Sequence, residues 1–371
     1  MGNKTNLNNQ IATYRRNFYN VYHSTIIPIF QKFETERKNQ LMILLTWIAF
    51  TIITLFISIK GLIDGNIPSF ISIILIIIGI VLLLWLPFHY NNKFVDKLKS
   101  ECMHKILEVF GKVQWYDKVS IISDTELNSS DLFSAYNRRE AKDAFSGNYK
   151  GVKFQICETH LYHESGSGKN RRVIEVFNGV VIKFKSNEDI RNKTIIATKG
   201  DTMIKRNNYF GLSLLSLLAY GILDSFRTGF DLGMLILWLV VVGVVAIGYM
   251  CYKLFWSSNE EVLNEIKLED PEFTKKYKAY SSDQVEGRYL ITAAFMERFK
   301  NLQTSFGTKK AKCSFYGDDL MFAISTNKNL FEIGNLFFSL NNPKQMETFF
   351  EELTSIFMLV DYFKLDEKTG L

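Results

Sequence analysis

Four uncharged, largely apolar stretches constrain the fold of this chain more than any other feature. They are Leu41–Ile59 (19 residues), Ile67–Tyr90 (24), Tyr209–Leu223 (15) and Leu232–Tyr252 (21), and none contains Asp, Glu, Lys or Arg. A helix needs about 20 apolar residues to cross the roughly 30 Å hydrocarbon core of a bilayer. Three of the four stretches satisfy this requirement. The exception, Tyr209–Leu223, reaches a plausible spanning length once Asn207, Asn208 and Phe226 are included. The sequence therefore predicts four transmembrane helices.

The loop lengths pair these spans into two helical hairpins. Only residues 60–66 join the first two spans, and only residues 224–231 join the last two. The long flanks carry three, four, five and two Lys or Arg residues within about 20 residues of the span ends, whereas each short loop carries one. Because basic residues favour the cytoplasmic side, both loops are expected outside and both termini inside. This pattern is typical of a multi-pass protein of the inner (plasma) membrane.

The remaining sequence has the composition of a folded protein. Its 371 residues are 47% hydrophobic and 14% aromatic, which excludes a disordered polyelectrolyte. The net charge of +6 is modest and the basic residues are interleaved with acidic ones, so a nucleic-acid partner is not expected. The four cysteines are widely spaced, without the close pairs of a zinc or redox motif, and indicate free thiols in a reducing compartment. The first 40 residues lack the apolar region of a cleaved signal peptide.

The predicted fold class is α+β, with transmembrane helical hairpins (four spans) and a cytoplasmic mixed α+β domain split by the second hairpin. The expected segments are an amphipathic N-terminal segment (1–40), a first hairpin (41–90), the first half of the domain (91–205), a second hairpin (206–257) and the second half (258–371). A hairpin insertion returns the chain to its starting side. The two halves are therefore expected to form one folded unit.

Local patterns in the first half predict helices and then strands. Apolar residues recur at helical spacing over 11–30, where Pro28 should kink or interrupt the helix, and over 94–110, which Gly111 should end. Strands are expected at 152–161 and 194–198. The strongest local signal is Val173–Phe177, Asn178-Gly179 and Val180–Phe184, which predicts a β-hairpin turning at Asn178-Gly179 because that dipeptide suits a type I′ turn.

Patterns in the second half predict a helix over 284–304, strands at 312–316 and 320–325, and a terminal helix. The terminal helix is well marked, since Asn342 is a good cap and Pro343 suits the first helical position.

One polar cluster carries the candidate binding residues: Asp283, Glu286, Arg288 and Tyr289. In a structural interpretation, Asp283 caps a helix and Glu286 reaches back to it as a capping box, while the apolar residues of this region, Val285, Tyr289, Met296 and Phe299, face the core. In a chemical interpretation, the three charged residues form an anion site at a helix N-terminus.

No catalytic residue, metal site or cofactor is predicted. His160 and His163 are three residues apart on an expected strand, so they point to opposite faces and would not converge on one ion. The loop Glu164–Lys169 lacks the first glycine and the final Ser or Thr of a phosphate-binding loop.

Several motifs resemble a bacterial membrane-protein family known as domain of unknown function 3137. They are Leu268–Phe273, Tyr280–Leu290 and Leu330–Glu332, together with Gly147–Phe154 and Val176–Val180 upstream. The resemblance covers roughly residues 90–205 and 260–365. Gly287 stands where the family more often has alanine, and the second hairpin splits a region that is usually continuous. The resemblance implies a membrane-anchored cytoplasmic α+β domain, and it assigns no activity.

The leading hypothesis is a non-enzymatic integral membrane protein whose cytoplasmic module binds a partner or the membrane surface, as a scaffold or regulator. Its expected partners are membrane lipids and other membrane or cytoplasmic proteins, and a homo-oligomer is compatible with the sequence. The alternative is a membrane-associated enzyme or lipid-handling protein with a charged pocket near Asp283, Glu286 and Arg288.

Overall fold

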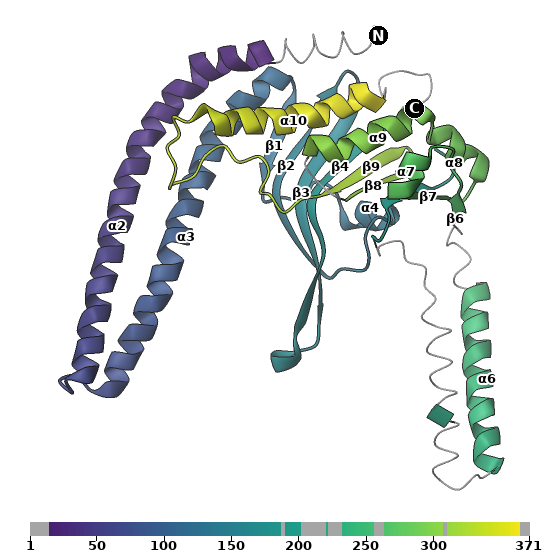
Figure 1. Ribbon diagram of the computed structural model, residues 1–371, viewed down its shortest axis with the longest axis horizontal. Coiled ribbons are helices and arrows are strands. Elements are labelled where there is room, and N and C mark those ends of the chain that lie inside the picture. The colour runs from purple at the N-terminus through teal and green to yellow at the C-terminus, as the bar shows by residue number, and fades with distance from the viewer. Residues whose placement is uncertain are drawn as a thin grey trace.

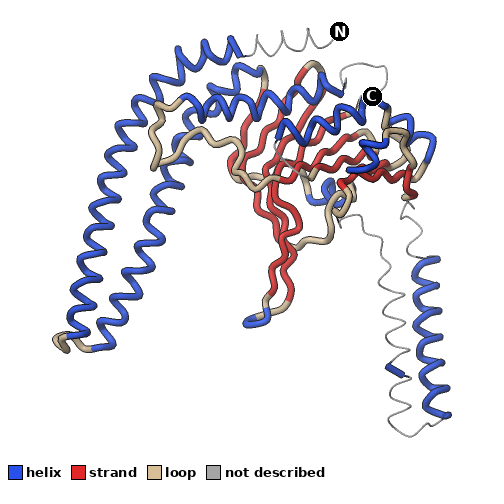
Figure 2. Tube along the Cα trace, viewed as in Figure 1, coloured by secondary structure: helices blue, strands red, loops and turns tan. Residues whose placement is uncertain are grey.

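The fold combines one large sheet with two long helices that extend away from it (Figure 1). The computed structural model describes residues 15–186, 190–201, 220–221, 232–255, 263–306 and 310–363. Within these residues, helices α9 and α10 lie over one face of the sheet and the short helix α4 lies on the other (Figures 1 and 2). The predicted α+β class is confirmed.

The sheet has nine described strands in the order β1-β2-β3-β4-β9-β8-β5-β7-β6, and all neighbours are antiparallel. The strands are β1 (Val113–Asp117), β2 (Arg138–Tyr149), β3 (Val152–Ser165), β4 (Arg172–Lys185), β5 (Thr194–Thr198), β6 (Asn264–Ile266), β7 (Tyr277–Ser281), β8 (Ala311–Tyr316) and β9 (Asp319–Ser325). Strands from before and after residues 206–257 interleave, since β4 pairs with β9 and β5 lies between β8 and β7.

The helices differ widely in length. They are α2 (Ile27–Ile63), α3 (Ser69–Leu107), α4 (Asp124–Ser129), α6 (Leu232–Phe255), α7 (Pro271–Lys276), α8 (Gln284–Leu290), α9 (Ala293–Phe306) and α10 (Pro343–Phe363), with a π-helical turn η1 (Tyr22–Ile26) and 3₁₀ turns η2 (Glu108–Phe110) and η3 (Gly168–Asn170). As predicted, α10 begins at Pro343, and the Asn342 side chain accepts a hydrogen bond from the Lys344 N–H at 3.1 Å.

Helices α2 and α3 each have an exposed apolar part and a buried part. Both are long and apolar enough to cross a membrane. With 37 and 39 residues they are about 56 and 58 Å long, well beyond the thickness of a bilayer core. Phe56 and Phe70, near the turn that joins them, are 68% and 64% exposed, whereas Phe33 and Phe94 are fully buried beside the sheet. Each helix therefore continues from a candidate membrane span into the protein core.

The other predicted spans are described in part. Helix α6 has 24 residues and coincides with the predicted fourth span. The predicted third span lies outside the described residues, apart from Tyr220 and Gly221.

Pro28 is accommodated without a break in the chain's helical path. Proline has no N–H to donate to the preceding turn. The preceding residues, Tyr22–Ile26, form the π-helical turn η1, and the Ile27 N–H donates to the Tyr22 carbonyl. Pro28 follows directly, so its missing donor falls where the hydrogen-bond pattern changes from the π-helical turn to α2.

The predicted hairpin at Asn178-Gly179 is wrong. β4 continues through this dipeptide, with Gly179 paired to Thr159 of β3 and to Ser325 of β9. A Cβ atom at Gly179 would lie 2.1 Å from the Ile324 carbonyl oxygen, so glycine is required here by the close approach of β9. The actual turn between β3 and β4 lies at residues 166–171.

The predicted helix over 284–304 is two helices. α8 ends at Leu290 and α9 starts at Ala293, with Ile291 outside the helical region (φ −97°, ψ 66°). The Thr292 hydroxyl accepts a hydrogen bond from the Phe295 N–H at 3.1 Å, so Thr292 caps the second helix.

Two apolar clusters lie on opposite faces of the sheet. We call the face under α3, α9 and α10 the covered face; its cluster includes Phe94, Phe154 and Phe322. We call the other the α4 face; its smaller cluster packs Leu127 of α4 onto Cys157 and neighbouring strand residues. The α2–α3 hairpin, α6 and the far end of β3 and β4 all point in the same direction from the sheet (Figures 1 and 2).

Candidate functional site: a lysine-rich hollow on the α4 face

The structure places Asp283 at the start of α8, where its carboxylate accepts hydrogen bonds from the N–H groups of Val285 (2.7 Å) and Glu286 (3.0 Å). The predicted cap is confirmed. The predicted return contact from Glu286 is wrong, because its carboxylate accepts from the Arg191 N–H (2.9 Å) and the Asn192 amide (2.5 Å). The loop before β5 supplies these donors and lies too far away in sequence for a local pattern to reveal it.

The other two candidates of that cluster point outward. Arg288 is exposed and Tyr289 is 60% exposed. Val285 is also exposed, so the predicted core-facing stripe is wrong for Val285 and Tyr289 and right for Met296 and Phe299. Asp283 and Glu286 therefore serve local structure, and the four residues do not converge on one ligand position.

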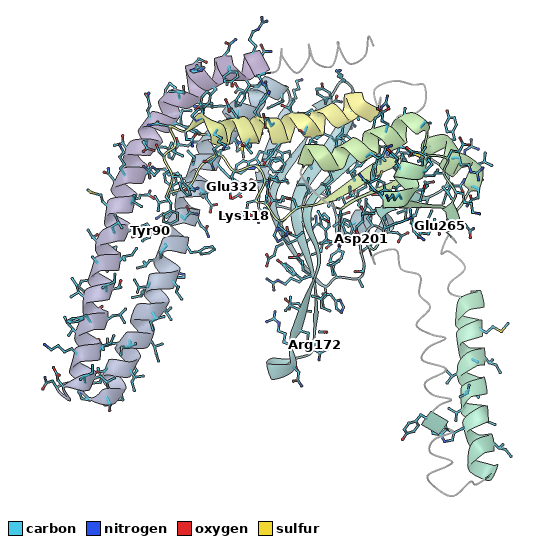
Figure 3. All side chains as sticks on the ribbon, in the orientation of Figure 1. Tyr90, Lys118, Arg172, Asp201, Glu265 and Glu332 are labelled. Carbon is cyan, nitrogen blue, oxygen red and sulfur yellow. The ribbon has the colours of Figure 1, made fainter. Side chains whose placement is uncertain are left out.

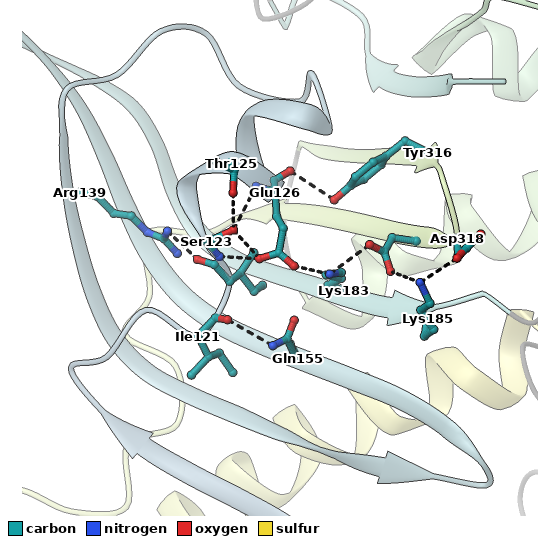
Figure 4. A network of polar contacts seen from close by, with 12 residues as sticks. Ile121, Ser123, Thr125, Glu126, Arg139, Gln155, Lys183, Lys185, Tyr316 and Asp318 are labelled. Carbon is teal, nitrogen blue, oxygen red and sulfur yellow. Dashed lines mark hydrogen bonds and ion pairs between the residues drawn. The ribbon is translucent and has the colours of Figure 1, made fainter. Parts of the chain in front are cut away.

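A different group of charges gathers on the α4 face, where residues 118–136 cross the strands. Ser123 and Glu126 form a complete capping box at the start of α4. Arg139 of β2 donates to the Ile122 carbonyl (2.8 Å) and to the Asp124 carboxylate (3.0 Å). The Tyr316 hydroxyl donates to the Glu126 carbonyl (3.3 Å) (Figure 4). These contacts hold α4 against the sheet.

Lys183 of β4 is the centre of this network (Figure 4). Its ammonium pairs with Glu126 of α4 and, at 3.1 Å, with Asp319 of β9. Burial disfavours the charge on Glu126, but hydrogen bonds from Lys183 and Ser123 outweigh it and lower the Glu126 pKa to about 2. Burial also opposes the charge on Lys183, yet its two carboxylate partners raise its pKa. Both groups are therefore ionised at neutral pH.

Beside this network the sheet is open and forms a hollow of about 490 Å³. We call it the lysine hollow; it is lined by Lys112, Ser146, Gly147, Asn148, Lys153, Phe154, Gln155, Lys183, Lys185 and Asp319. Four of these residues are lysines and one is an aspartate, so the lining is strongly basic. It lies near the β2–β3 turn, at the opposite end of β3 from the β3–β4 turn.

The four lysines differ in what they contact. Lys183 and Lys185 are ion-paired, the latter to Asp318 at 3.1 Å. Lys112 and Lys153 are exposed, and neither has a carboxylate within ion-pair distance in the described part of the chain. Two ammonium groups are thus available to an anion, which suits a carboxylate or phosphate group.

The sequence carries a local signal for this hollow. Polar residues alternate with apolar ones at Lys153-Phe154-Gln155 and Lys183-Phe184-Lys185. The alternation places the polar members on one face of two strands. In the structure Gln155 lies directly opposite Lys183, which brings the polar rows together. The strand order that joins them was not available from the sequence.

No group of three or more His, Cys, Asp or Glu residues that could hold a metal ion is found among the described residues. His160 lies 3.3 Å from the Tyr162 hydroxyl, in hydrogen-bond contact with it.

The structure is that of an α+β protein with two candidate membrane helices and a basic hollow on its sheet. Residues 175–365, just over half of the chain, match the family described as protein of unknown function (DUF3137), and the chain belongs to that family. No curated protein and no solved structure matches it.

Proposed function

We propose that this chain is a non-enzymatic, four-span protein of the inner (plasma) membrane whose cytoplasmic α+β unit binds an anion-bearing partner at the lysine hollow. In this proposal both termini lie in the cytoplasm, and the second hairpin interrupts the unit between β5 and β6. The protein acts as a membrane scaffold or regulator, presenting the hollow to soluble partners.

The observation that carries the proposal is the continuity of α2 and α3 with the sheet. A buried ion pair fixes this junction: Arg37 pairs with Glu34 at 2.7 Å and donates to the Leu336 carbonyl at 3.0 Å. Glu34 also accepts from the Leu340 N–H at 3.0 Å. These contacts join α2 to the loop before α10, and Lys99 of α3 pairs with Asp143 of β2. Buried contacts thus connect the candidate membrane helices to the sheet, which supports a role in placing a binding surface at a fixed position.

The charge of the hollow supports an anionic partner. Lys112 and Lys153 have no ion-pair partner among the described residues. Electrostatic complementarity steers association and fixes register more than it adds affinity. An acidic protein segment or a phosphate-bearing group has the required chemistry.

Copurification tests the proposed partner. The intact protein is isolated in mild detergent, and bound proteins and lipids are identified for the parent, for Lys112→Gln/Lys153→Gln and for the matched control Arg171→Gln/Arg172→Gln. We expect an acidic partner that is lost from the hollow variant and with rising salt, but retained by the control. Equal recovery from all three proteins would reject the hollow as its binding site.

Reporter fusions test the proposed topology at Gly65, Gly229 and Leu371. The basic flanks predict external signals at the two loops and an internal signal at the C-terminus. A cytoplasmic signal at either loop, or an external one at Leu371, contradicts four spans with both termini inside.

The enzymatic alternative at Asp283, Glu286 and Arg288 has less support. Both of its carboxylates already accept hydrogen bonds from backbone and amide donors, and its arginine is exposed.

A further inference from the structure

The end of β3 and β4 projects beyond the rest of the sheet. β2 stops pairing with β3 at Tyr162, and β9 stops pairing with β4 at Gly179. From His163 to Ile174 the two strands pair only with each other, around the turn at 166–171. We call residues 163–174 the β3–β4 ribbon. An isolated two-stranded ribbon is marginally stable in water, so contact with a partner would stabilise it.

The ribbon combines exposed apolar and basic side chains. Val173 and Ile174 are 50% and 58% exposed. Residues 165–174 contain Lys169, Arg171 and Arg172 and no acidic residue. This combination is typical of segments that bind at a membrane interface, where apolar groups enter the headgroup boundary and basic groups meet anionic lipids.

The one acidic side chain of the ribbon is already neutralised. Glu164 pairs with Arg138 at 2.6 Å and with Arg171 at 2.5 Å, and these hydrogen bonds, led by that from Arg138, lower its pKa. The Arg172 guanidinium has no ion pair or hydrogen bond within the described residues. Arg172 is thus positioned to bind an external anion.

The direction in which the ribbon projects indicates what its partner is. It leaves the sheet on the same side as the α2–α3 hairpin and α6 (Figure 1). Arg172 lies at its far end, while Tyr90 lies along α3 (Figure 3). If α2 and α3 cross the bilayer, the ribbon points at that bilayer. The lysine hollow lies at the other end of β3, away from it.

We propose that the tip of the β3–β4 ribbon docks on the acidic phospholipid surface of the membrane that α2 and α3 span. Arg171 and Arg172 meet the lipid phosphates, and Val173 and Ile174 enter the interfacial layer. The inference rests on the proposed membrane anchoring. It adds a contact that holds the sheet in one orientation, with the hollow turned toward the cytoplasm.

The test uses the full chain in nanodiscs that contain about 30 mol% phosphatidylglycerol, or phosphatidylcholine alone. An environment-sensitive fluorophore is attached to one introduced cysteine in a Cys251→Ser background, since Cys102, Cys157 and Cys313 are buried. Ser167→Cys reports on the ribbon tip, and Lys150→Cys reports on the turn at the other end of β3. Leu45→Cys, at an exposed position of α2, reports on membrane insertion. Lipids with a quencher on the acyl chain measure contact.

We expect quenching at 45 and 167 and none at 150, with quenching at 167 dependent on phosphatidylglycerol. Arg171→Gln/Arg172→Gln should lower the ratio of docked to free ribbon about fivefold for each charge removed. Val173→Ser/Ile174→Ser should also weaken docking. The matched control Lys275→Gln/Lys276→Gln removes two exposed charges from the end of α7 and should leave the signal at 167 unchanged.

Each contrary result has a distinct meaning. Absence of quenching at 45 rejects the membrane anchoring itself. Quenching at 45 but not at 167 rejects only the ribbon inference. A signal at 167 that follows protein concentration in lipid-free detergent also overturns it, and assigns the ribbon to a second copy of the chain.

Discussion

The two faces of the sheet are built for different tasks. The covered face packs a large aromatic cluster beneath α3, α9 and α10 and includes Phe33 from the candidate membrane helix α2. The α4 face has a small cluster under α4, with the lysine hollow open beside it. Burial of apolar surface supplies most folding free energy. The covered face therefore provides stability and coupling to the helices, and the α4 face leaves charged groups free to bind.

The Lys99–Asp143 pair on the covered face and the lysines of the hollow also differ in how deeply they are buried. On the covered face Lys99 pairs with Asp143, and both are nearly fully buried. Losing one partner of such a pair strands a charge in a poorly solvating interior. At the hollow, Lys185 is half exposed and Lys153 is exposed, so water already solvates them. Substitutions in the Lys99–Asp143 pair should thus affect stability, and substitutions of the exposed lysines of the hollow should affect binding.

The largest effect is expected from Arg37→Met at the junction of α2 with the covered face. Removing the guanidinium leaves Glu34 buried without its ionic partner, which should cost about 3–5 kcal/mol of unfolding free energy. Denaturant unfolding of the full chain in detergent, followed by modification of Cys102, measures this cost. Burial raises the Cys102 pKa to about 12, so the thiol reacts only after the core opens.

The double variant Glu34→Gln/Arg37→Met is the control for that measurement. It removes the stranded charge and should recover a large part of the lost stability. An Arg37→Met protein as stable as the parent would show that the junction does not depend on this pair, and would weaken the contrast between the faces.

The next largest effect is a pH dependence at Glu158, on the covered-face side of β3. Burial raises its pKa to about 7 from the ordinary 4.5, although Lys142 opposes the rise. The folded state therefore holds this proton more tightly than the unfolded chain. Stability from Glu158 is greatest below about pH 4.5 and falls by about 2–3 kcal/mol as pH rises to 7. Unfolding at about pH 5 and pH 8 measures the difference.

Glu158→Gln should abolish this slope and stabilise the protein at the higher pH, because a neutral amide needs no proton. Glu126→Gln on the α4 face is the matched comparison. Since the Glu126 pKa is lowered to about 2, its stabilisation is present above the ordinary value of 4.5 and is lost only as pH falls through 2. Glu126 should therefore contribute no slope between about pH 5 and pH 8, and Glu126→Gln should keep the slope of the parent protein. If the unfolding free energies of the parent and of Glu158→Gln depend on pH in the same way, the pH dependence does not come from Glu158.

The sequence predicted elements well where one local pattern determined them. β5 was located at Thr194–Thr198 to the residue, and the start of α10 followed from Asn342 and Pro343. The sequence-based predictions were wrong where contact with a distant strand determines the local structure. Asn178-Gly179 has the chemistry of a turn, but the approach of Ile324 from β9 explains why the strand continues. A contact between residues 179 and 324 leaves no local pattern to detect.

The same reason explains the outcome at the candidate sites. The Asp283 cap is local and was predicted, whereas Glu286 is directed by Arg191 and Asn192, from a loop outside its own segment. The lysine hollow combines residues from β2, β3, β4 and β9 with Lys112, which directly precedes β1. Alternation could place these lysines on one side of each strand, but only the strand order brings them together.

A smaller effect is expected for Asp283→Ala, at the start of α8 beyond both apolar clusters. Two backbone N–H groups lose their acceptor, which should cost about 0.5–2 kcal/mol of unfolding free energy. Asp283→Asn and Asp283→Ser retain a capping oxygen and should cost much less. Thermal unfolding of the three variants is compared with complementation of a deletion strain at matched abundance. Loss of function in a fully stable Asp283→Asn protein would favour the enzyme alternative, because asparagine lacks basicity.

The smallest effect on stability is expected for Lys112→Gln/Lys153→Gln, in the lysine hollow. Both ammonium groups are exposed and unpaired within the described residues, so their removal should change the unfolding free energy by less than about 0.5 kcal/mol. Relief of repulsion from Lys183 and Lys185 even favours a slight gain. The denaturant midpoint followed at Cys157, beneath the same face, measures this change directly. A loss of unfolding free energy as large as that expected for Arg37→Met would mean that the hollow is part of the structural core. The covered face would then not be the main source of stability, and the contrast between the two faces would be wrong.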